Sequence, residues 1–421
     1  MVPLDIDRIR AQFPVLRRRV NDHPLVYLDS AATSQKPRAV LDAERAFLEH
    51  HNAAVHRGAH ALAAEATELF EVSRERLARF LGATAEEIVW TAGATAALNL
   101  LAYSFSNASS GRGGAQAERF RLRPGDELVV TELEHHANLI PWQELAGRTG
   151  ATLRHIGVDD AGRLRMDEAA GIIGERTRVL AFAHVSNVLG AINPVAELVA
   201  LARRVGALVV LDACQSAPHL PLDVKALDVD FAVLSGHKML GPLGIGVLYG
   251  RRELLDAMPP FLTGGSMITS VTMEHAEYLP SPARFEAGTQ PVSQAIGLAA
   301  AVDFLDDLGM DRVHERDAEL GQALATGLAA IPGIRLLGPA PGEPRVGLAG
   351  FIVDGVHSHD VGQFLDELGI AVRVGHHCAE PLHRRLGLAA STRASTSVYT
   401  TDADLAAFLD GVGRVRAFFR A

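Results

Sequence analysis

The sequence predicts an α/β protein whose larger part is a mostly parallel sheet with helices on both faces. Short apolar segments, such as 127–131, 179–183 and 207–211, alternate with stretches of helical period, which is the pattern of a parallel sheet. From about residue 310 the chain changes to long helices and a few separated strands. This second pattern indicates a separate, smaller α+β domain.

The order of elements follows from the same reading. A short polar helix over 5–13 precedes a brief strand at 26–29, and helices are expected at 40–50 and at 65–81, where Gly82 closes the second. The further strands expected in the large sheet are 88–91, 127–131, 150–158, 179–183, 207–211, 231–234 and 245–248. Residues 106–123 are of low complexity and are expected to form an exposed loop. The smaller domain is expected to hold helices at 313–331 and 359–368 and a strand at 371–374.

Composition limits the classes of function. The chain has 421 residues, of which 48% are hydrophobic, and its net charge of −10 disfavours nucleic acid and anionic membranes as partners. No apolar run approaches the roughly 18 residues of a membrane span, and the N-terminus has no signal-peptide pattern. The two cysteines, Cys214 and Cys378, lie far apart and do not suggest a disulfide scaffold. We therefore expect a reducing, cytoplasmic location.

Lys238 is the residue that most narrows the chemistry. It lies in Ser235-Gly-His-Lys238, between two predicted core strands, where an unpaired ammonium is costly to bury. A lysine that reaches solvent from the strand end is one reading, and a Schiff base with an aldehyde cofactor is the other. Asp212 favours the second reading because it ends the preceding predicted strand. A carboxylate that pairs with the pyridine nitrogen and a lysine that holds the aldehyde carbon are what pyridoxal phosphate requires.

Two loops carry further candidates for this cofactor. Gly93 opens a predicted helix with Thr95 in its first turn, and such a turn offers free amide groups and the positive helix end to a phosphate. His135 and His136 follow the strand at 127–131. A zinc site is disfavoured because the ligand spacings of zinc motifs are absent, so an imidazole stacked on a cofactor ring is the better reading.

A second reactive centre is predicted at Cys378. It lies in Arg373-Val-Gly-His-His-Cys378, and cationic neighbours lower the pKa of a thiol and so favour a nucleophile. Arg393 is a candidate clamp for a substrate carboxylate, with a surface arginine as the alternative. Cys214, beside the Asp212 strand end, is interpreted as a packing residue.

With these residues assembled, the chain resembles the SUF-type (group II) cysteine desulfurases, a branch of the class V aminotransferase-like, fold-type I pyridoxal phosphate enzymes. The resemblance extends from about Leu4 to Phe419 and is most like actinobacterial members. The stretches that carry it are Tyr27-Leu-Asp-Ser-Ala-Ala-Thr33, His56-Arg-Gly58, Glu134-His-His-Ala-Asn138, Ser235-Gly-His-Lys-Met-Leu-Gly-Pro242, Arg284-Phe-Glu-Ala-Gly-Thr289 and Arg373-Val-Gly-His-His-Cys378.

The resemblance implies a role for each site residue. Lys238 holds the cofactor covalently, Asp212 pairs with its pyridine nitrogen, and His135 stacks on its ring and carries protons. Further cofactor contacts are implied for Ala94, Thr95, Asn187, Gln215, Ser235, His237 and, from the neighbouring subunit of a homodimer, Thr289. Arg393 takes the substrate carboxylate, and the rest of the substrate pocket is formed by Ala31, Ala32, His56, Arg57, Asn187 and Arg373. Cys378 accepts the sulfur of L-cysteine as a persulfide and passes it to an acceptor protein of the SUF system for Fe–S cluster assembly.

The resemblance also implies three parts of the chain: residues 1–25 packing with the small domain, a large cofactor-binding domain over 26–290, and a small domain over 291–421. The phosphate segment Ala92-Gly-Ala-Thr-Ala96 departs from the usual Arg-Gly-Thr-Thr-Glu of the family, and Tyr399-Thr-Thr401 replaces Tyr-Asn-Thr. Selenocysteine lyase or another C–S lyase of the same fold, a non-catalytic binding partner, and a zinc site at His376, His377 and Cys378 are the competing readings.

Overall fold

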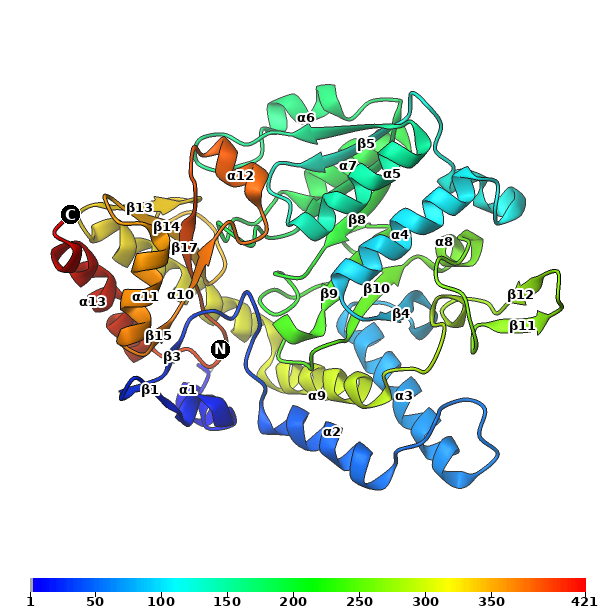
Figure 1. Cartoon of the computed structure of the whole chain (residues 1–421), viewed down its shortest axis with the longest axis horizontal. Coiled ribbons are helices and arrows are strands. Elements are labelled where there is room, and N and C mark those ends of the chain that lie inside the picture. Colours follow the sequence, from blue (N-terminus) through cyan, green and yellow to red (C-terminus); the bar gives the residue numbers. More distant parts are fainter. Residues whose placement is uncertain (1–2) are drawn as a thin grey trace.

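The computed structural model describes residues 3–421, and its largest element is a seven-stranded sheet in the order β4-β10-β9-β8-β7-β5-β6 (Figure 1). The strands are β4 (Ile88–Thr91), β5 (Glu127–Thr131), β6 (Thr152–Ile156), β7 (Thr177–Ala183), β8 (Leu208–Asp212), β9 (Phe231–Ser235) and β10 (Gly246–Gly250). β10 is antiparallel to both of its neighbours, β4 and β9, and all other neighbouring pairs in this sheet are parallel. The predicted mostly parallel α/β fold is therefore confirmed.

Alternation along the strands divides the core into two layers, because successive side chains of a strand point to opposite faces. Along β5, Val129 packs in one apolar cluster, whereas Leu128 and Val130 pack in another. The first cluster includes residues of α2 (Arg38–His50), α3 (Ala61–Phe80), α7 (Val195–Val205) and α9 (Val292–Leu308), and the second includes residues of α4 (Ala94–Ser109), α5 (Ile140–Thr149) and α8 (Arg252–Ala257). Helices thus cover both faces of the sheet.

A second, four-stranded antiparallel sheet has the order β13-β14-β17-β16 and its own apolar cluster. Its strands are β13 (Ile334–Leu337), β14 (Leu348–Val353), β16 (Arg373–Gly375) and β17 (Ser391–Ser395), and the helices nearby are α10 (Met310–Ala330), α11 (Ser358–Glu367), α12 (Glu380–Arg385) and α13 (Asp402–Phe419). Both chain ends lie on this side of the molecule (Figure 1).

The N-terminal segment contacts the C-terminal part of the chain. In α1 (Ile6–Arg10) the Arg10 guanidinium donates to both carboxylate oxygens of Asp404, at 2.8 and 3.3 Å. Strand β3 (Val26–Tyr27) pairs in parallel with β15 (Ile370–Ala371). Helix α9, by contrast, packs on α2 and α3, beside the large sheet. The three predicted domain boundaries themselves stay a prediction.

Two local predictions need correction. The predicted loop over 106–123 is wrong: α4 continues to Ser109, and a 3-10 helix over Gly114–Phe120 buries Phe120 against Phe105, with ring centroids 5.1 Å apart. The many small polar residues of this segment favoured a loop, although Phe120 packs in the core. A hairpin of β11 (Ile268–Val271) and β12 (Ala276–Tyr278) was not expected and projects from the body of the molecule (Figure 1).

The remaining elements are β1 (Arg19–Val20), β2 (His23–Pro24) and α6 (Met166–Ile172). None of the helices among residues 3–421 has the length and apolar character to cross a membrane.

Gly246 lets β10 approach the turn between β4 and α4. It is paired with both Thr91 and Ser235. A Cβ atom at this position would lie 2.5 Å from the Gly93 Cα and 2.5 Å from the Leu234 carbonyl oxygen, both of them backbone atoms. Backbone in a packed sheet yields little, so this glycine is required for the local geometry.

We therefore expect Gly246→Ala to lower stability by about 1–3 kcal/mol through overpacking, and the thermal unfolding midpoint by roughly 2–10 °C. Gly413→Ala in α13 is the matched control, because nothing lies within 4 Å of its added methyl group and alanine favours a helix. Equal midpoints for the two variants would contradict this account of the sheet.

His184 follows β7 and is buried with its Nδ1 unpartnered among the described residues. Burial disfavours the charged imidazole and lowers the pKa of His184 from 6.5 to about 4. Between these two pH values the unfolded chain binds a proton that the folded chain does not bind. The contribution of the neutral His184 to the free energy of unfolding is therefore complete above about pH 6.5 and is lost as the pH falls towards 4.

His184→Gln is expected to reduce the loss of unfolding free energy between pH 7 and pH 4 by up to about 3 kcal/mol. Denaturant titrations of the two proteins at both pH values measure this difference. His275→Gln changes an exposed imidazole on the hairpin and should leave the acid loss as in the parent. An unchanged loss in His184→Gln would show that this imidazole does not couple folding to pH.

Candidate active site

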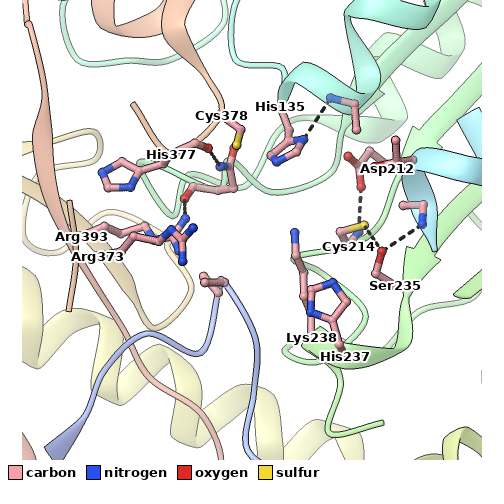
Figure 2. Close-up of a pocket in the computed structure, with 16 residues that line it drawn as sticks. His135, Asp212, Cys214, Ser235, His237, Lys238, Arg373, His377, Cys378 and Arg393 are labelled. Carbon is pink, nitrogen blue, oxygen red and sulfur yellow. Dashed lines mark hydrogen bonds between the residues drawn. The ribbon is translucent and has the colours of Figure 1, made fainter. Parts of the chain in front are cut away.

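A cavity of about 200 Å³ lies at the carboxyl edge of the large sheet, where it meets the second sheet (Figure 2). Parallel strands end together at this edge, so the residues that follow them converge. The predicted site residues that line the cavity are Ala31, Ala32, Ala94, Thr95, His135, Asn187, Asp212, Ser235, His237, Lys238, Arg373, Cys378 and Arg393. Sequence reasoning therefore located most of the wall.

Lys238 and Asp212 face this cavity without pairing with each other (Figure 2). Lys238 ends a 3-10 turn after β9, and its amino group has no hydrogen bond or ion pair within residues 3–421. Asp212 ends β8, and its Oδ1 accepts from the Cys214 amide at 2.9 Å. An amine and a buried carboxylate held apart in one cavity fit a group that binds the amine covalently and presents a cationic nitrogen to the carboxylate.

His135 enters the cavity with a defined tautomer. Its Nδ1 accepts from the Ala137 amide at 3.0 Å, so the proton of the neutral ring is on Nε2. Burial and the nearby Lys238 charge lower the pKa of His135 to about 4. The ring is therefore neutral at pH 7.

The turn before His135 is held by Glu134, a residue that sequence reasoning quoted without giving it a role. The buried Glu134 carboxyl accepts from the Thr131 hydroxyl, the Asn138 side-chain amide and the Ala183 backbone amide. Trp142 Nε1 in turn donates to Asn138 Oδ1 at 3.0 Å. These contacts fix the direction in which the chain leaves β5.

The amino end of α4, where the sequence predicts a phosphate cup, borders the cavity. Gly93, with φ of +145°, precedes the helix, and the Ala94 amide donates to Ser235 Oγ at 2.9 Å. The buried Nδ1 of His237 has no hydrogen-bond partner within residues 3–421, and burial lowers the pKa of His237 to about 4. A helix amino end with hydroxyl and imidazole groups suits a phosphate. Alanine at positions 92 and 96 removes the arginine and the glutamate of the usual family segment.

The opposite wall is cationic. Arg393 is 2% exposed, and it donates to the Asn187 carbonyl at 2.9 Å and to Asp29 Oδ1 at 3.3 Å. Arg373 donates to the other Asp29 oxygen at 3.5 Å. Burial lowers the pKa of Arg393 to about 10, which leaves it charged at pH 7. Two guanidinium groups share one carboxylate, and the Arg393 Nε has no partner within residues 3–421, so this wall retains capacity for an anion.

Cys378 lies at the mouth of the cavity and is exposed. His377 and Cys378 have φ values of +52° and +57°, a left-handed conformation that is unfavourable for residues with side chains. Two contacts from the large-sheet side hold the loop: the His136 amide donates to the Cys378 carbonyl at 2.7 Å, and Asn187 Nδ2 donates to the His377 carbonyl at 2.6 Å. Such strain persists only where surrounding contacts fix it, and it is typical of functional sites.

Four predicted residues do not line this cavity. The Gln215 side chain donates to the Ala31 carbonyl at 2.9 Å and leaves its buried Oε1 without a partner among residues 3–421. His56 pairs with Glu71 at 2.9 Å, and Arg57 is exposed beside it. Thr289 lines a different cavity of about 290 Å³. The single chain therefore does not bring His56, Arg57 or Thr289 to Lys238.

Three lining residues were not predicted: Ala137, Cys214 and His377. Cys214 was interpreted as a packing residue, and it does pack in an apolar cluster, but it also forms part of the cavity wall. Burial raises the pKa of the Cys214 thiol, so this thiol is protonated. Within residues 3–421 no group of three or more His, Cys, Asp or Glu side chains is arranged to hold a metal.

Comparison with known proteins gives the same picture. The family profile Aminotransferase class-V matches residues 26–408. "Probable cysteine desulfurase 2" of Mycobacterium leprae is 56% identical and the alignment covers 100% of this chain and 98% of that protein. "Probable cysteine desulfurase" of Streptomyces coelicolor is 50% identical, with coverage of 99% and 98%. The crystal structure of the cysteine desulfurase CsdA from Escherichia coli superposes with a TM-score of 0.88 at 37% identity and covers 99% of this chain and 100% of that one.

The cystine C–S lyase C-DES, solved with its reaction product cysteine persulfide, is a more distant neighbour. It has a TM-score of 0.80 at 25% identity, and covers 96% of this chain and 99% of that one. Full-length identity is thus much higher to the cysteine desulfurases than to this lyase. The chain belongs to the class-V aminotransferase family of pyridoxal phosphate enzymes and, within it, to the SUF-type cysteine desulfurases.

Proposed function

We propose that Cys378 accepts the sulfur of L-cysteine as a persulfide, leaves L-alanine as the other product, and passes the sulfur to an acceptor protein for Fe–S cluster assembly. The observation that carries the proposal is an exposed thiol at the mouth of the cavity that also contains Lys238 and Asp212. A nucleophile there reaches both a bound substrate and an external partner.

In the proposed site each wall has one task. Lys238 holds the cofactor covalently, Asp212 pairs with its ring nitrogen, and His135 covers its ring. The residues at the phosphate are Ala94, Thr95, Ser235 and His237. The residues at the ring oxygen are Asn187 and Gln215. Bound pyridoxal phosphate supplies an electron-accepting ring that stabilises negative charge developing on the substrate carbon. Gln215 Oε1 and His237 Nδ1, which have no partner in the described part of the chain, supply polar atoms for such a group.

The cationic wall orients the substrate. Arg393 takes the carboxylate of L-cysteine, with Arg373 beside it, and Ala31 and Ala32 leave room for the small side chain. Cysteine bound in this way directs its sulfur towards Cys378. The Cys378 thiolate forms a new S–S bond to the substrate sulfur while the substrate C–S bond breaks. The electron pair of that bond stays with the three-carbon fragment, which takes up protons and leaves as alanine.

We also infer a homodimer in a reducing compartment such as the cytoplasm. Thr289 lies away from Lys238 in its own chain, in a cavity with Trp90 and Phe261 near the exposed Leu262. An apolar rim of this kind is suited to a second copy, and in the dimer Thr289 would serve the phosphate of the neighbouring subunit. His56 and Arg57 are proposed to line the pocket in the same assembly. Free Cys214 and Cys378 thiols are compatible with a reducing location.

Lys238→Ala and Cys378→Ala test the assignment. The purified protein should absorb near ~420 nm as a protonated Schiff base of the cofactor, and Lys238→Ala should lose this covalent attachment. Cys378→Ala should keep the band and lose cysteine-dependent sulfide and alanine release by at least about 100-fold, because the acceptor of the sulfur is gone. Cys214→Ala is the matched cysteine control and should keep sulfide release.

The outcomes separate the alternatives. Sulfide release that survives in Cys378→Ala would reject Cys378 as acceptor and favour C–S lyase chemistry. If Cys378→Ala turns over selenocysteine but not cysteine, selenocysteine lyase activity is present in addition. A colourless parent protein would reject the enzyme and leave a binding protein.

Subunit mixing tests the dimer. Thr289→Ala should lower cofactor affinity at the site of the other chain, and Lys238→Ala is inactive in its own chain. A heterodimer of the two variants then has one site with both Lys238 and Thr289 intact and one site with neither, so the heterodimer purified after co-expression should show native cofactor affinity at about half of its sites. A single-chain mass in sedimentation, or no restoration, would contradict the proposal that Thr289 acts across the interface.

A further inference from the structure

A hydrogen-bonded chain of three side chains lies behind the Cys378 loop. His383 Nδ1 lies 3.0 Å from the Ala379 carbonyl, His383 Nε2 lies 2.9 Å from Ser391 Oγ, and the same oxygen lies 2.9 Å from His377 Nε2. All three side chains are buried: Ser391 and His383 are 0% exposed and His377 is 6% exposed. None of the three was assigned a role above.

The proton positions in this chain follow from one carbonyl group. A carbonyl oxygen only accepts, so His383 Nδ1 must carry a proton, and the neutral ring then accepts at Nε2. Ser391 has a single proton, which it donates to that Nε2, so its oxygen must accept from His377 Nε2–H. Burial lowers the pKa values of both histidines, that of His377 to about 2, which agrees with two neutral rings.

The chain connects the cysteine loop to the strand that carries the substrate clamp. Ser391 and Arg393 lie two residues apart on β17, so their side chains leave the same face of the strand. Ser391 holds His377, the residue before Cys378, and Arg393 faces the cavity. The distance between the carboxylate site and the thiol is therefore set through one strand.

We propose that Ser391, held by His383, is a positioning residue that fixes His377 and thereby holds the Cys378 thiol at attacking distance from the sulfur of the bound substrate. This inference rests on the proposed role of Cys378. The left-handed backbone at His377 and Cys378 is what makes such an anchor necessary. Misplacement of a nucleophile by about 1 Å lowers a rate by roughly 100-fold.

The test uses the cofactor-loaded enzyme. Ser391→Ala should lower kcat for alanine formation by about 10- to 100-fold, with the KM for cysteine within about twofold and the cofactor absorbance unchanged. Ser391→Thr keeps the hydroxyl group and should keep kcat within about threefold of the parent. Ser104→Ala is the matched control, because it removes a fully buried hydroxyl group that has no partner within the described residues.

Coupling is tested by a double variant. His383→Phe should lower kcat as Ser391→Ala does, and the two changes together should cost no more than either one, because they break one chain. Nitrogen-15 NMR of the histidine rings in the parent protein should show protonated Nδ1 in His383 and protonated Nε2 in His377, a result that depends on no variant folding. The opposite tautomers, equal kcat in Ser391→Ala and Ser104→Ala, or additive losses would each overturn the inference.

Cys378→Ala, assayed in parallel, separates this inference from the proposed function. If it still releases sulfide, the proposed function has failed and the inference fails with it. If Cys378→Ala is inactive while Ser391→Ala matches the control, only the positioning role of Ser391 is rejected.

Discussion

The architecture depends on keeping the half-buried Lys238 amine and the buried Asp212 carboxylate apart. The two residues come at the ends of neighbouring parallel strands, β9 and β8, and face one cavity without an ion pair between them. Such an arrangement is costly by itself, since both groups lose water and neither gains the opposite charge of the other. It becomes favourable when a group between them takes up both interactions. The rigidity of the sheet is therefore a functional requirement, because movement of either strand end would let the two charges collapse onto each other.

Burial and the Lys238 charge together set the electrostatics of the cavity. Burial first, and the nearby Lys238 ammonium second, disfavour cationic imidazoles, and the pKa values of His135 and His237 are both lowered to about 4. The positive charge that remains available to an anionic substrate is on the guanidinium groups of Arg373 and Arg393, which stay charged when partly or fully buried. Neutral rings thus line the Lys238 side of the cavity and guanidinium cations line the opposite side, so the two ends of the cavity keep their characters over the physiological pH range.

Sequence reasoning located the cavity wall where its residues follow from the order of strands. Asp212 ends the apolar run of β8, and Lys238 and Cys378 come a few residues after β9 and after the start of β16, so their places near strand ends were predictable. Sequence reasoning failed where the structure depends on contacts between distant segments. Nothing in the local sequence shows that Phe120 packs on Phe105, or that Ser391 joins His377 to His383. Cys214 packs in an apolar cluster, as its apolar neighbours in the sequence indicate, but those neighbours do not reveal that the same side chain also borders a cavity.

Under the proposed function, the Cys378 loop has to meet two conflicting demands of sulfur transfer. A nucleophile must be fixed relative to the substrate carboxylate, which favours burial, and a sulfur donor must be accessible to another protein, which favours exposure. Here the backbone and the preceding side chain are fixed, through the His377 and Cys378 carbonyls and the buried His377 ring, while the thiol itself remains exposed. A cysteine held by its backbone in this way cannot travel far. Under the proposed function, therefore, the acceptor has to bring its own reactive group to the mouth of the cavity to collect the sulfur.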